Sequence, residues 1–278
     1  MKLAKVFKEN KQFTLFSILA LVVVGVAVFA PQIAPYDPLD AVMLESLQAP
    51  SSAHPFGTDK LGRDLLSRVI FGTRTSLIMT LCLVAVIFVI GTFLGVIAGY
   101  FGGIVDGVIM RIADMMISFP GLVLAIAIAG MLGPNLVNAV ISIAAVSWTK
   151  YARLARSMVL RVKKNLYIEA AVVNGTRTWK ILLVHVLPNM VTQMIVTAAA
   201  DIGTMMLELA SLSFLGFGAT APTPEWGLML NEGRTYMAKA PWLMIYPGIA
   251  IVICVVIFNM LGDSIRDVLD PRQDRKST

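Results

Sequence analysis

Residues 77–99 of the chain read LIMTLCLVAVIFVIGTFLGVIAG, a run of 23 residues that contains no charged side chain. A helix needs about 20 mostly apolar residues to cross the hydrocarbon core of a bilayer. The strands of a membrane barrel would instead be short and would alternate apolar with polar residues. Because this run is long and continuously apolar, it predicts a membrane-spanning helix.

The composition of the whole chain is typical of a protein embedded in lipid. Of its 278 residues, 57% are hydrophobic and 14% are charged, and the mean hydropathy is +0.79. A soluble domain is about 45–50% apolar and about 25% charged. The values exclude an ordinary soluble enzyme and a disordered chain. Cys82 and Cys254 each lie in an apolar run, which argues against a disulfide scaffold.

The predicted fold class is an all-α membrane protein with six transmembrane helices. The expected spans lie at about 13–33, 77–99, 112–132, 136–152, 189–210 and 243–261. The first apolar run is longer than the roughly 7–15-residue core of a signal peptide. We therefore expect it to be an uncleaved first span.

The distribution of lysine and arginine predicts the orientation of these spans, because basic residues favour the cytoplasmic side. With a cytoplasmic N-terminus, 17 of the 23 basic residues fall in inside segments and 6 fall in outside segments. Eight of the inside residues lie between positions 150 and 180. We therefore expect both termini to be cytoplasmic. The positive charge orients the bundle and need not indicate a nucleic-acid partner.

The span pattern divides the chain into three regions. Residues 1–76 comprise an N-terminal cytoplasmic stub, the first transmembrane helix and an outside amphipathic segment. Residues 77–272 form a five-helix core with a cytoplasmic loop at 153–188, and residues 273–278 form a cytoplasmic tail. In the amphipathic segment, we expect Arg63, Asp64 and Arg68 to face water.

The inside loop carries an ordered-looking pattern, EAAVVNGTRTWKILLVHVLPN at residues 169–189. Its first residues favour a helix, and Gly175 permits a left-handed turn or a close backbone approach. Pro188 marks the start of the fifth span. The pattern predicts a short helix, a turn and a second helix that returns to the membrane. Such a short helix is suited to docking in a groove of a soluble partner.

The loop resembles the "EAA" loop of ABC-importer membrane subunits. The residues that match the pattern are Glu169, Ala170, Ala171, Gly175, Leu187 and Pro188. His185 stands where the family usually has isoleucine, a mild departure that fits the peptide/nickel branch. Further segments resemble the same branch: GTDKLGRDLLSRVIFGTRTSL at 57–77, GYFGGIVDGVIMRIADMMISFP at 99–120, SFLGFGATAPTPEWGLMLNEGR at 213–234 and FNMLGDSIRDVLDPR at 258–272.

Together these segments resemble the second ("C") permease of dipeptide, oligopeptide or nickel importers, with a slight lean to nickel. The resemblance implies a type I ABC-importer permease fold in a bacterial or archaeal cytoplasmic membrane. It implies four partners: a homologous permease, two ABC ATPase subunits and an extracytoplasmic solute-binding protein. The matched loop would couple the ATPases to the spans. ATP and Mg²⁺ would bind to the ATPases, since this sequence lacks a G-x-x-x-x-G-K-[ST] phosphate loop. We expect no cofactor on this chain.

Two acids fall inside the fifth expected span, where ionisable groups are costly and suggest function. Asp201 and Glu208 lie seven residues apart, which places them on one helix face close to Thr204. Two interpretations stay open. The acids line the translocation path, or they face the sister permease or a buried arginine and hold the bundle together.

We expect the other charged or sulfur-containing side chains to have structural roles and not to form a functional site. Arg111 and Asp114 have the spacing of a helical ion pair, and Asp106 is expected in a solvated loop. The methionines at 115–116 and 205–206 are expected to fill apolar packing. His54 and His185 fall on opposite sides of the membrane, so we expect no metal site.

Two other functions compete with an importer subunit. A stand-alone secondary carrier or channel would use Asp201 and Glu208 to bind its coupling ion, but it has no need of a long, ordered cytoplasmic loop. An intramembrane enzyme would need a nucleophile and a base at membrane depth, and neither G-x-S-x-G nor H-E-x-x-H occurs. We therefore expect a transport subunit without catalytic residues.

Overall fold

The computed structural model describes residues 10–269, and within this range the regular elements are helices. The N-terminal lysines at positions 2, 5 and 8 and the tail at 273–278 lie outside the described residues. The elements are α2 (Lys11–Val28), α3 (Ala30–Ile33), η1 (Met43–Glu45), α4 (Leu65–Phe101), α5 (Gly103–Ile117), α6 (Gly121–Leu132), α7 (Leu136–Lys163), α8 (Leu166–Val173), α9 (Thr178–Ile181), η2 (Leu182–Val186), α10 (Leu187–Phe214), α11 (Trp226–Gly233), η3 (Arg234–Tyr236) and α12 (Trp242–Leu269).

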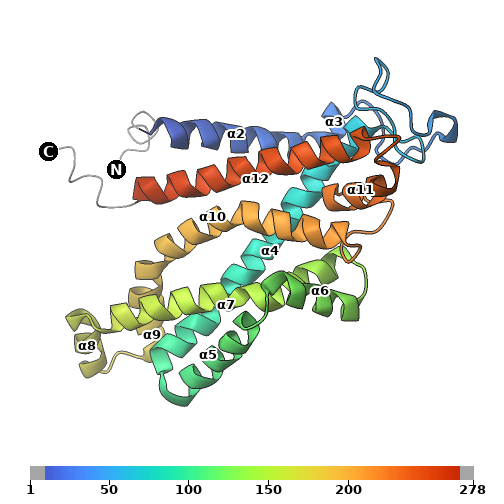
Figure 1. Ribbon diagram of the computed structural model, residues 1–278. Helices are drawn as coiled ribbons and strands as arrows, with labels where there is room; N and C mark the ends of the chain where they lie inside the picture. The colour runs from blue at the N-terminus through green and yellow to red at the C-terminus, as the bar shows by residue number, and fades with distance from the viewer. Residues whose placement is uncertain (1–9, 270–278) are drawn as a thin grey trace.

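The long helices form an elongated bundle (Figure 1). Helices α2 and α12 lie side by side, and α10 packs against α12. Helix α4 crosses the bundle and packs along α7. Helices α8 and α9 lie at the same end as the start of α2 and the end of α12, whereas α3 and α11 lie at the opposite end (Figure 1). The expected inside loop and the described ends of the chain therefore share one end of the bundle.

Fewer helices have the length and apolarity of a membrane span than the six expected. Among residues 10–269, four qualify: Lys11–Val28, Leu65–Phe101, Thr178–Phe214 and Trp242–Leu269. The pair α5 and α6 adds a fifth if the bent pair is one span. The fourth expected span lies in α7, which is long enough but carries basic residues along its second half. The structure therefore confirms an all-helical membrane protein but not the count of six spans.

The third expected span, at 112–132, is wrong as a single helix. Helix α5 ends at Ile117, α6 begins at Gly121, and the two are bent by 93°. Pro120 is the residue that precedes α6. The ring of a proline disfavours the α conformation at the preceding residue, so the helix is interrupted at Phe119. The apolar run continues through this break, which is why hydropathy alone does not reveal it.

Helix α4 begins at Leu65, earlier than the expected second span, and includes the end of the outside amphipathic segment. Asp64 caps it, since its carboxylate accepts the backbone N–H of Ser67 at 2.7 Å. The helix then runs unbroken for 37 residues, so the expected boundary at residues 76 and 77 falls inside it. At about 1.5 Å per residue it is longer than the hydrocarbon core is thick, so part of it extends beyond the core.

The charged residues at the start of α4 do not face water, which corrects the expectation for Arg63, Asp64 and Arg68. Both arginines are only 1% exposed, and Asp64 is buried with them. Arg63 Nε lies 2.6 Å from Asp59 Oδ2, and Arg68 Nη2 lies 3.5 Å from Glu232 Oε2. The ion pairs satisfy charges that would otherwise be costly to bury. They also join the segment before α4 to α11.

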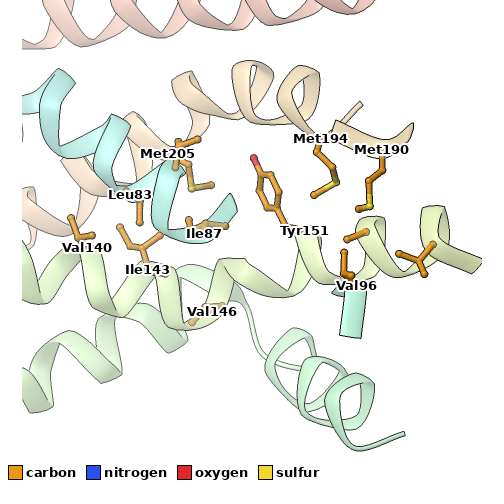
Figure 2. Packing of buried hydrophobic residues seen from close by; sticks show 14 of the residues in the cluster. Leu83, Ile87, Val96, Val140, Ile143, Val146, Tyr151, Met190, Met194 and Met205 are labelled. Atoms are coloured by element: carbon orange, nitrogen blue, oxygen red, sulfur yellow. The ribbon is translucent and has the colours of Figure 1, made fainter. Parts of the chain in front are cut away.

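The main core lies between α4, α6, α7 and α10. Met190, Met194 and Met205 reach into it from α10 toward Tyr151 and Ile87 (Figure 2). Met205 and Met206 are buried among apolar side chains, as expected for packing residues, whereas Met115 is exposed. Among the described residues no group of three or more His, Cys, Asp or Glu could hold a metal ion.

Two expectations about acids near α5 are wrong. Asp114 pairs with Arg153 of α7, whose Nη2 lies 2.5 Å from Asp114 Oδ1, rather than with Arg111. Asp106 lies in α5 and not in a solvated loop, and its two oxygens accept from Arg156 of α7 at 2.5 and 2.6 Å. Both carboxylates therefore connect α5 to α7.

Candidate functional site

A cavity of about 380 Å³ opens between the α5–α6 bend, α7 and α10. One side is apolar and is formed near the bend. The other side carries ionisable groups from α7 and α10. The lining residues are Met116, Ile117, Phe119, Gly121, Val146, Ser147, Thr149, Lys150, Tyr151, Asp201, Thr204, Met205 and Glu208. The Pro120 bend therefore shapes one wall of the cavity.

Asp201 is buried at the edge of this cavity and is held by two donors from α7. Lys150 Nζ lies 2.6 Å from Asp201 Oδ1, and the Tyr151 hydroxyl donates to Oδ2 at 2.9 Å. Each carboxylate oxygen thus has a partner, which compensates the cost of burying the charge. Asp201 is therefore paired within this chain, but its partner is a lysine and not the buried arginine expected as one alternative.

Glu208 lines the same cavity and is half-buried. Helix α10 places Asp201, Thr204 and Glu208 on one face, since positions three and seven residues apart coincide on a helix. Within residues 10–269 no hydrogen bond or ion pair holds the Glu208 carboxylate. Thr204 is exposed toward the cavity. The helical spacing therefore correctly predicted that the three side chains share one surface.

Lys150 and Tyr151 are the partners of Asp201, and the sequence did not single them out as site residues. Lys150 follows the apolar run of α7 and was counted among the basic residues of the inside loop. A lysine at the end of an apolar run, in a chain with an acid inside another span, is a usable signal for such a pair. Tyr151 gives no signal of this kind, because tyrosine is ordinary in a core.

The loop after α7 forms a second feature at the end of the bundle (Figure 1). Helix α8 covers Leu166–Val173 and contains Glu169, Ala170 and Ala171. Both Glu169 and Ala170 are exposed, and Ala171 is half-buried. The expected short helix is therefore present, and its matched residues lie on or near the surface.

Gly175 ends α8 in the left-handed conformation, with a φ of +70°. The backbone N–H of Thr176 donates to Ala171 O and that of Gly175 to Val172 O, both at 3.0 Å. This pair of bonds is a Schellman motif, in which glycine is favoured because it has no Cβ. An added Cβ at Gly175 would have no neighbour within 4 Å. Of the two roles allowed for Gly175, the structure shows the left-handed turn and not the close approach.

Leu187 and Pro188 lie where the chain returns to the bundle. Pro188 occupies the first turn of α10, where its missing N–H costs little. The preceding segment, η2, is a π-helix that connects α9 to α10. A π-turn before proline is one way to accommodate the ring and the missing hydrogen bond. The helix that contains the fifth expected span therefore starts before Pro188, and Thr178–Phe214 is continuous and apolar enough to hold a span.

Apolar side chains on α8 point away from the bundle. Leu166 is 81% exposed and Val173 is 86% exposed, while Ile168 anchors the helix to the core. Val172 and the nearby Trp179 are also exposed. A short helix with an uncovered apolar surface is the geometry of a helix that docks in a groove.

The chain combines apolar helices with a charged cavity between them, and it presents an exposed short helix at the end of the bundle. These features are those of a membrane transport subunit. Residues 91–275 match the family described as binding-protein-dependent transport system inner membrane component. Residues 2–50 match the N-terminal transmembrane domain of oligopeptide transport permease C. The chain belongs to the binding-protein-dependent transport system inner membrane components.

Curated relatives agree with this family. The chain is 42% identical over 268 residues to the dipeptide transport system permease protein DppC of Alkalihalophilus pseudofirmus, covering 96% of this chain and 88% of the relative. It is 44% identical over 253 residues to the glutathione transport system permease protein GsiD of Pectobacterium atrosepticum, covering 91% and 84%. It is 40% identical over 277 residues to the probable D,D-dipeptide transport system permease protein DdpC of Escherichia coli, covering 100% and 93%.

A solved structure supports the fold. The chain superposes with a TM-score of 0.59 on a structure titled "Inward facing conformations of the MetNI methionine ABC transporter", covering 74% of this chain and 98% of that one. The two are 20% identical, so the likeness concerns the fold alone. It agrees with the expected type I ABC-importer permease fold.

The comparisons bear on two further points about function, the lean to nickel and the alternative of a stand-alone carrier or channel. The lean to nickel has no support, since the relatives reported above are named for dipeptides and glutathione. A stand-alone carrier or channel is not favoured either, because the family comprises components of binding-protein-dependent systems. The relatives are permeases and not enzymes, and this chain is a permease subunit.

Proposed function

We propose that the chain is one of two permeases in an ATP-driven importer of dipeptides and related short peptides such as glutathione. Its partners in the lipid bilayer and beside it are a homologous permease, two ABC ATPases and an extracytoplasmic solute-binding protein. ATP and Mg²⁺ bind to the ATPases, and this chain binds no cofactor. The support for the cargo is the family and the names of the relatives.

The observation that carries this proposal is the exposed apolar surface of α8. Water-facing apolar residues on an ordered helix indicate that a partner covers them. The anchored Ile168 and the Schellman turn at Gly175 hold α8 rigid enough to transmit a displacement to α7 and α10. We therefore assign Glu169, Ala170, Ala171, Gly175, Leu187 and Pro188 to the contact with the ATPase and to its coupling.

We infer a cytoplasmic position for α8 and for both termini. The segment from residue 150 to residue 180, which runs from the second half of α7 to α9, holds eight basic residues, and basic segments at the ends of spans favour the cytoplasm. The start of α2 and the end of α12 lie at the same end as α8 (Figure 1). The buried ion pairs around Arg63 and Arg68 lie at the other end, which we assign to the extracytoplasmic face.

We assign the cavity between α7 and α10 to the translocation path. Asp201, Thr204 and Glu208 then form part of its wall. A water-accessible wall explains how Glu208 can lie half-buried in an apolar helix, since ionisable groups in spans face a bundle interior or a cavity. The ion pair of Asp201 with Lys150 is compatible with this role, because both side chains line the cavity.

The test changes Val173, which has no fold-stabilising role because its side chain is exposed. In the full importer, Val173→Glu places a charge in the apolar docking surface and is expected to reduce ATPase co-purification and peptide uptake at least about tenfold. Val173→Leu keeps the surface apolar and is the matched control, with both readings near those of the unmodified chain. Full co-purification and uptake with Val173→Glu would contradict the assignment of α8.

A further inference from the structure

We propose that the cavity between α7 and α10 is a cargo subsite that binds both charged ends of a short peptide. Glu208 accepts from the peptide α-ammonium group, and the Lys150 ammonium donates to the peptide carboxylate. This inference rests on the proposed function and names the chemical feature of the cargo that the path recognises.

The cation of the subsite is already positioned. Asp201 Oδ1 holds Lys150 Nζ at 2.6 Å, and Tyr151 occupies the other carboxylate oxygen. An ammonium group has three N–H donors, so Lys150 retains donors after this contact. Its side chain is 59% exposed and lines the cavity. Lys150 can therefore bind a carboxylate of the cargo while it remains paired with Asp201.

The anion of the subsite lacks a partner. Within residues 10–269 no hydrogen bond or ion pair holds Glu208, although Asp201 on the same helix face has two. A partly buried carboxylate without a partner is costly. Together Lys150, Asp201 and Glu208 carry one positive and two negative charges. The cavity therefore has an excess negative charge at the Glu208 end, where an ammonium group of the cargo would compensate it.

The helical rise between the two acids of the cavity is close to the length of a short peptide. Asp201, which holds Lys150, and Glu208 are separated by seven residues, or about 10 Å along a helix. An extended chain spans at most about 3.6 Å per residue, so two to three residues bridge this distance. The volume of about 380 Å³ lies within the range of small-molecule sites.

The remaining wall carries no further charged side chain. Met116, Phe119, Val146 and Met205 offer apolar and adaptable contacts beside the hydroxyl groups of Ser147, Thr149 and Thr204. Flexible methionine surfaces accommodate varied partners. A site that fixes the two charged ends and offers an uncharged, mostly apolar surface between them would pass peptides of different sequence.

The test uses the full importer in liposomes, with the solute-binding protein, and compares three cargoes: a dipeptide, its N-acetyl form and its C-terminal amide. For each variant the ratio of dipeptide uptake to modified-dipeptide uptake is divided by the same ratio for the unmodified importer. This normalisation cancels the selectivity of the binding protein. Glu208→Gln is expected to lower the dipeptide to N-acetyl ratio about tenfold, the scale of one charge-assisted contact.

The second variant addresses the other end of the cargo. The double change Lys150→Met and Asp201→Asn removes the pair without leaving a buried unpaired charge, and it is expected to lower the dipeptide to amide ratio by a similar factor. Asp263→Asn is the control, since Asp263 is exposed on α12 and outside the cavity. Both ratios should stay unchanged in this control.

The outcomes separate this inference from the proposed function. If the unmodified importer shows no ATP-driven peptide uptake, the proposed function fails and the subsite with it. If the unmodified importer transports the dipeptide but both normalised ratios stay near one in the variants, only the subsite is overturned. The subsite is supported if Glu208→Gln lowers the N-acetyl ratio and the double variant lowers the amide ratio. In both variants the loaded binding protein must still stimulate ATP hydrolysis.

Discussion

At Gly175 the backbone holds a φ of +70°, and two hydrogen bonds of 3.0 Å close the turn. A residue with a Cβ pays about 1–2 kcal/mol in this conformation. Gly175→Ala is therefore expected to loosen the turn, and trypsin should cut at the neighbouring Arg177 about fivefold faster in the folded importer. The rate of appearance of the two fragments measures this effect.

Gly175→Asn is the matched control, because asparagine adopts the left-handed conformation more readily than alanine does. It adds a larger side chain in open space, since nothing lies within 4 Å of an added Cβ. We expect a smaller rise in cleavage than with alanine. Equal cleavage rates in the alanine variant and the unmodified chain would mean that the left-handed turn does not stabilise α8.

Residue-level chemistry could be predicted in part from the sequence. The helical period correctly placed Asp201 and Glu208 on one surface of α10. The partners of Asp201 could not be predicted, because Lys150 and Tyr151 lie about 50 positions away and approach only through the packing of α7 on α10. The same reason explains why Asp114 was matched to Arg111 and not to Arg153.

At the scale of elements, α4 and α7 pack closely through small residues. Gly91, Gly95 and Gly99 face Ala152, Ala155 and Val159 of α7, and a Cβ at Gly95 would collide with the carbonyl oxygen of Ala152. Stripes of small residues let helix backbones approach one another in membranes. This stripe determines how close the two helices lie, and α7 carries Lys150 and Tyr151 toward α10.

Gly95→Leu is expected to separate α4 from α7 and to destabilise the chain by about 2 kcal/mol, the usual cost of overpacking. The apparent Tm of the purified protein in detergent should fall by about 4–8 °C. Gly25→Leu on α2 is the control, because an added Cβ there meets nothing within 4 Å. Equal Tm values for the two variants would show that the contact does not limit the packing.

Element boundaries show where sequence patterns stop being informative. Hydropathy placed the apolar runs correctly but could not find the 93° bend between α5 and α6, because the residues on both sides of Pro120 are apolar. It also ended the outside segment at residue 76, which lies inside α4, and there Arg63 and Arg68 were expected to face water. Their ion pairs with Asp59 and Glu232 neutralise them, and the contact with Glu232 joins positions far apart in the sequence.

At the scale of the whole molecule, the two groups of charged residues lie at opposite ends of the bundle. The basic end of α7 and helix α8 lie at one end, and the buried ion pairs of α4 and α11 lie at the other (Figure 1). The cavity lies between α7 and α10, the helices on either side of the α8 loop. A displacement of α8 by a partner would therefore act directly on both charged walls of the cavity. This arrangement would link the proposed ATPase contact to the proposed path without a catalytic group on this chain.

The central claim is that this chain moves short peptides only as part of an ATP-driven assembly. The most direct measurement is uptake of a labelled dipeptide into liposomes that contain the chain, its homologous permease and the two ATPases, with the solute-binding protein added outside. We predict uptake that requires both ATP and the binding protein and that persists when an ionophore collapses the ion gradients. Peptide uptake by this chain alone, driven by an ion gradient and independent of ATP, would contradict the account.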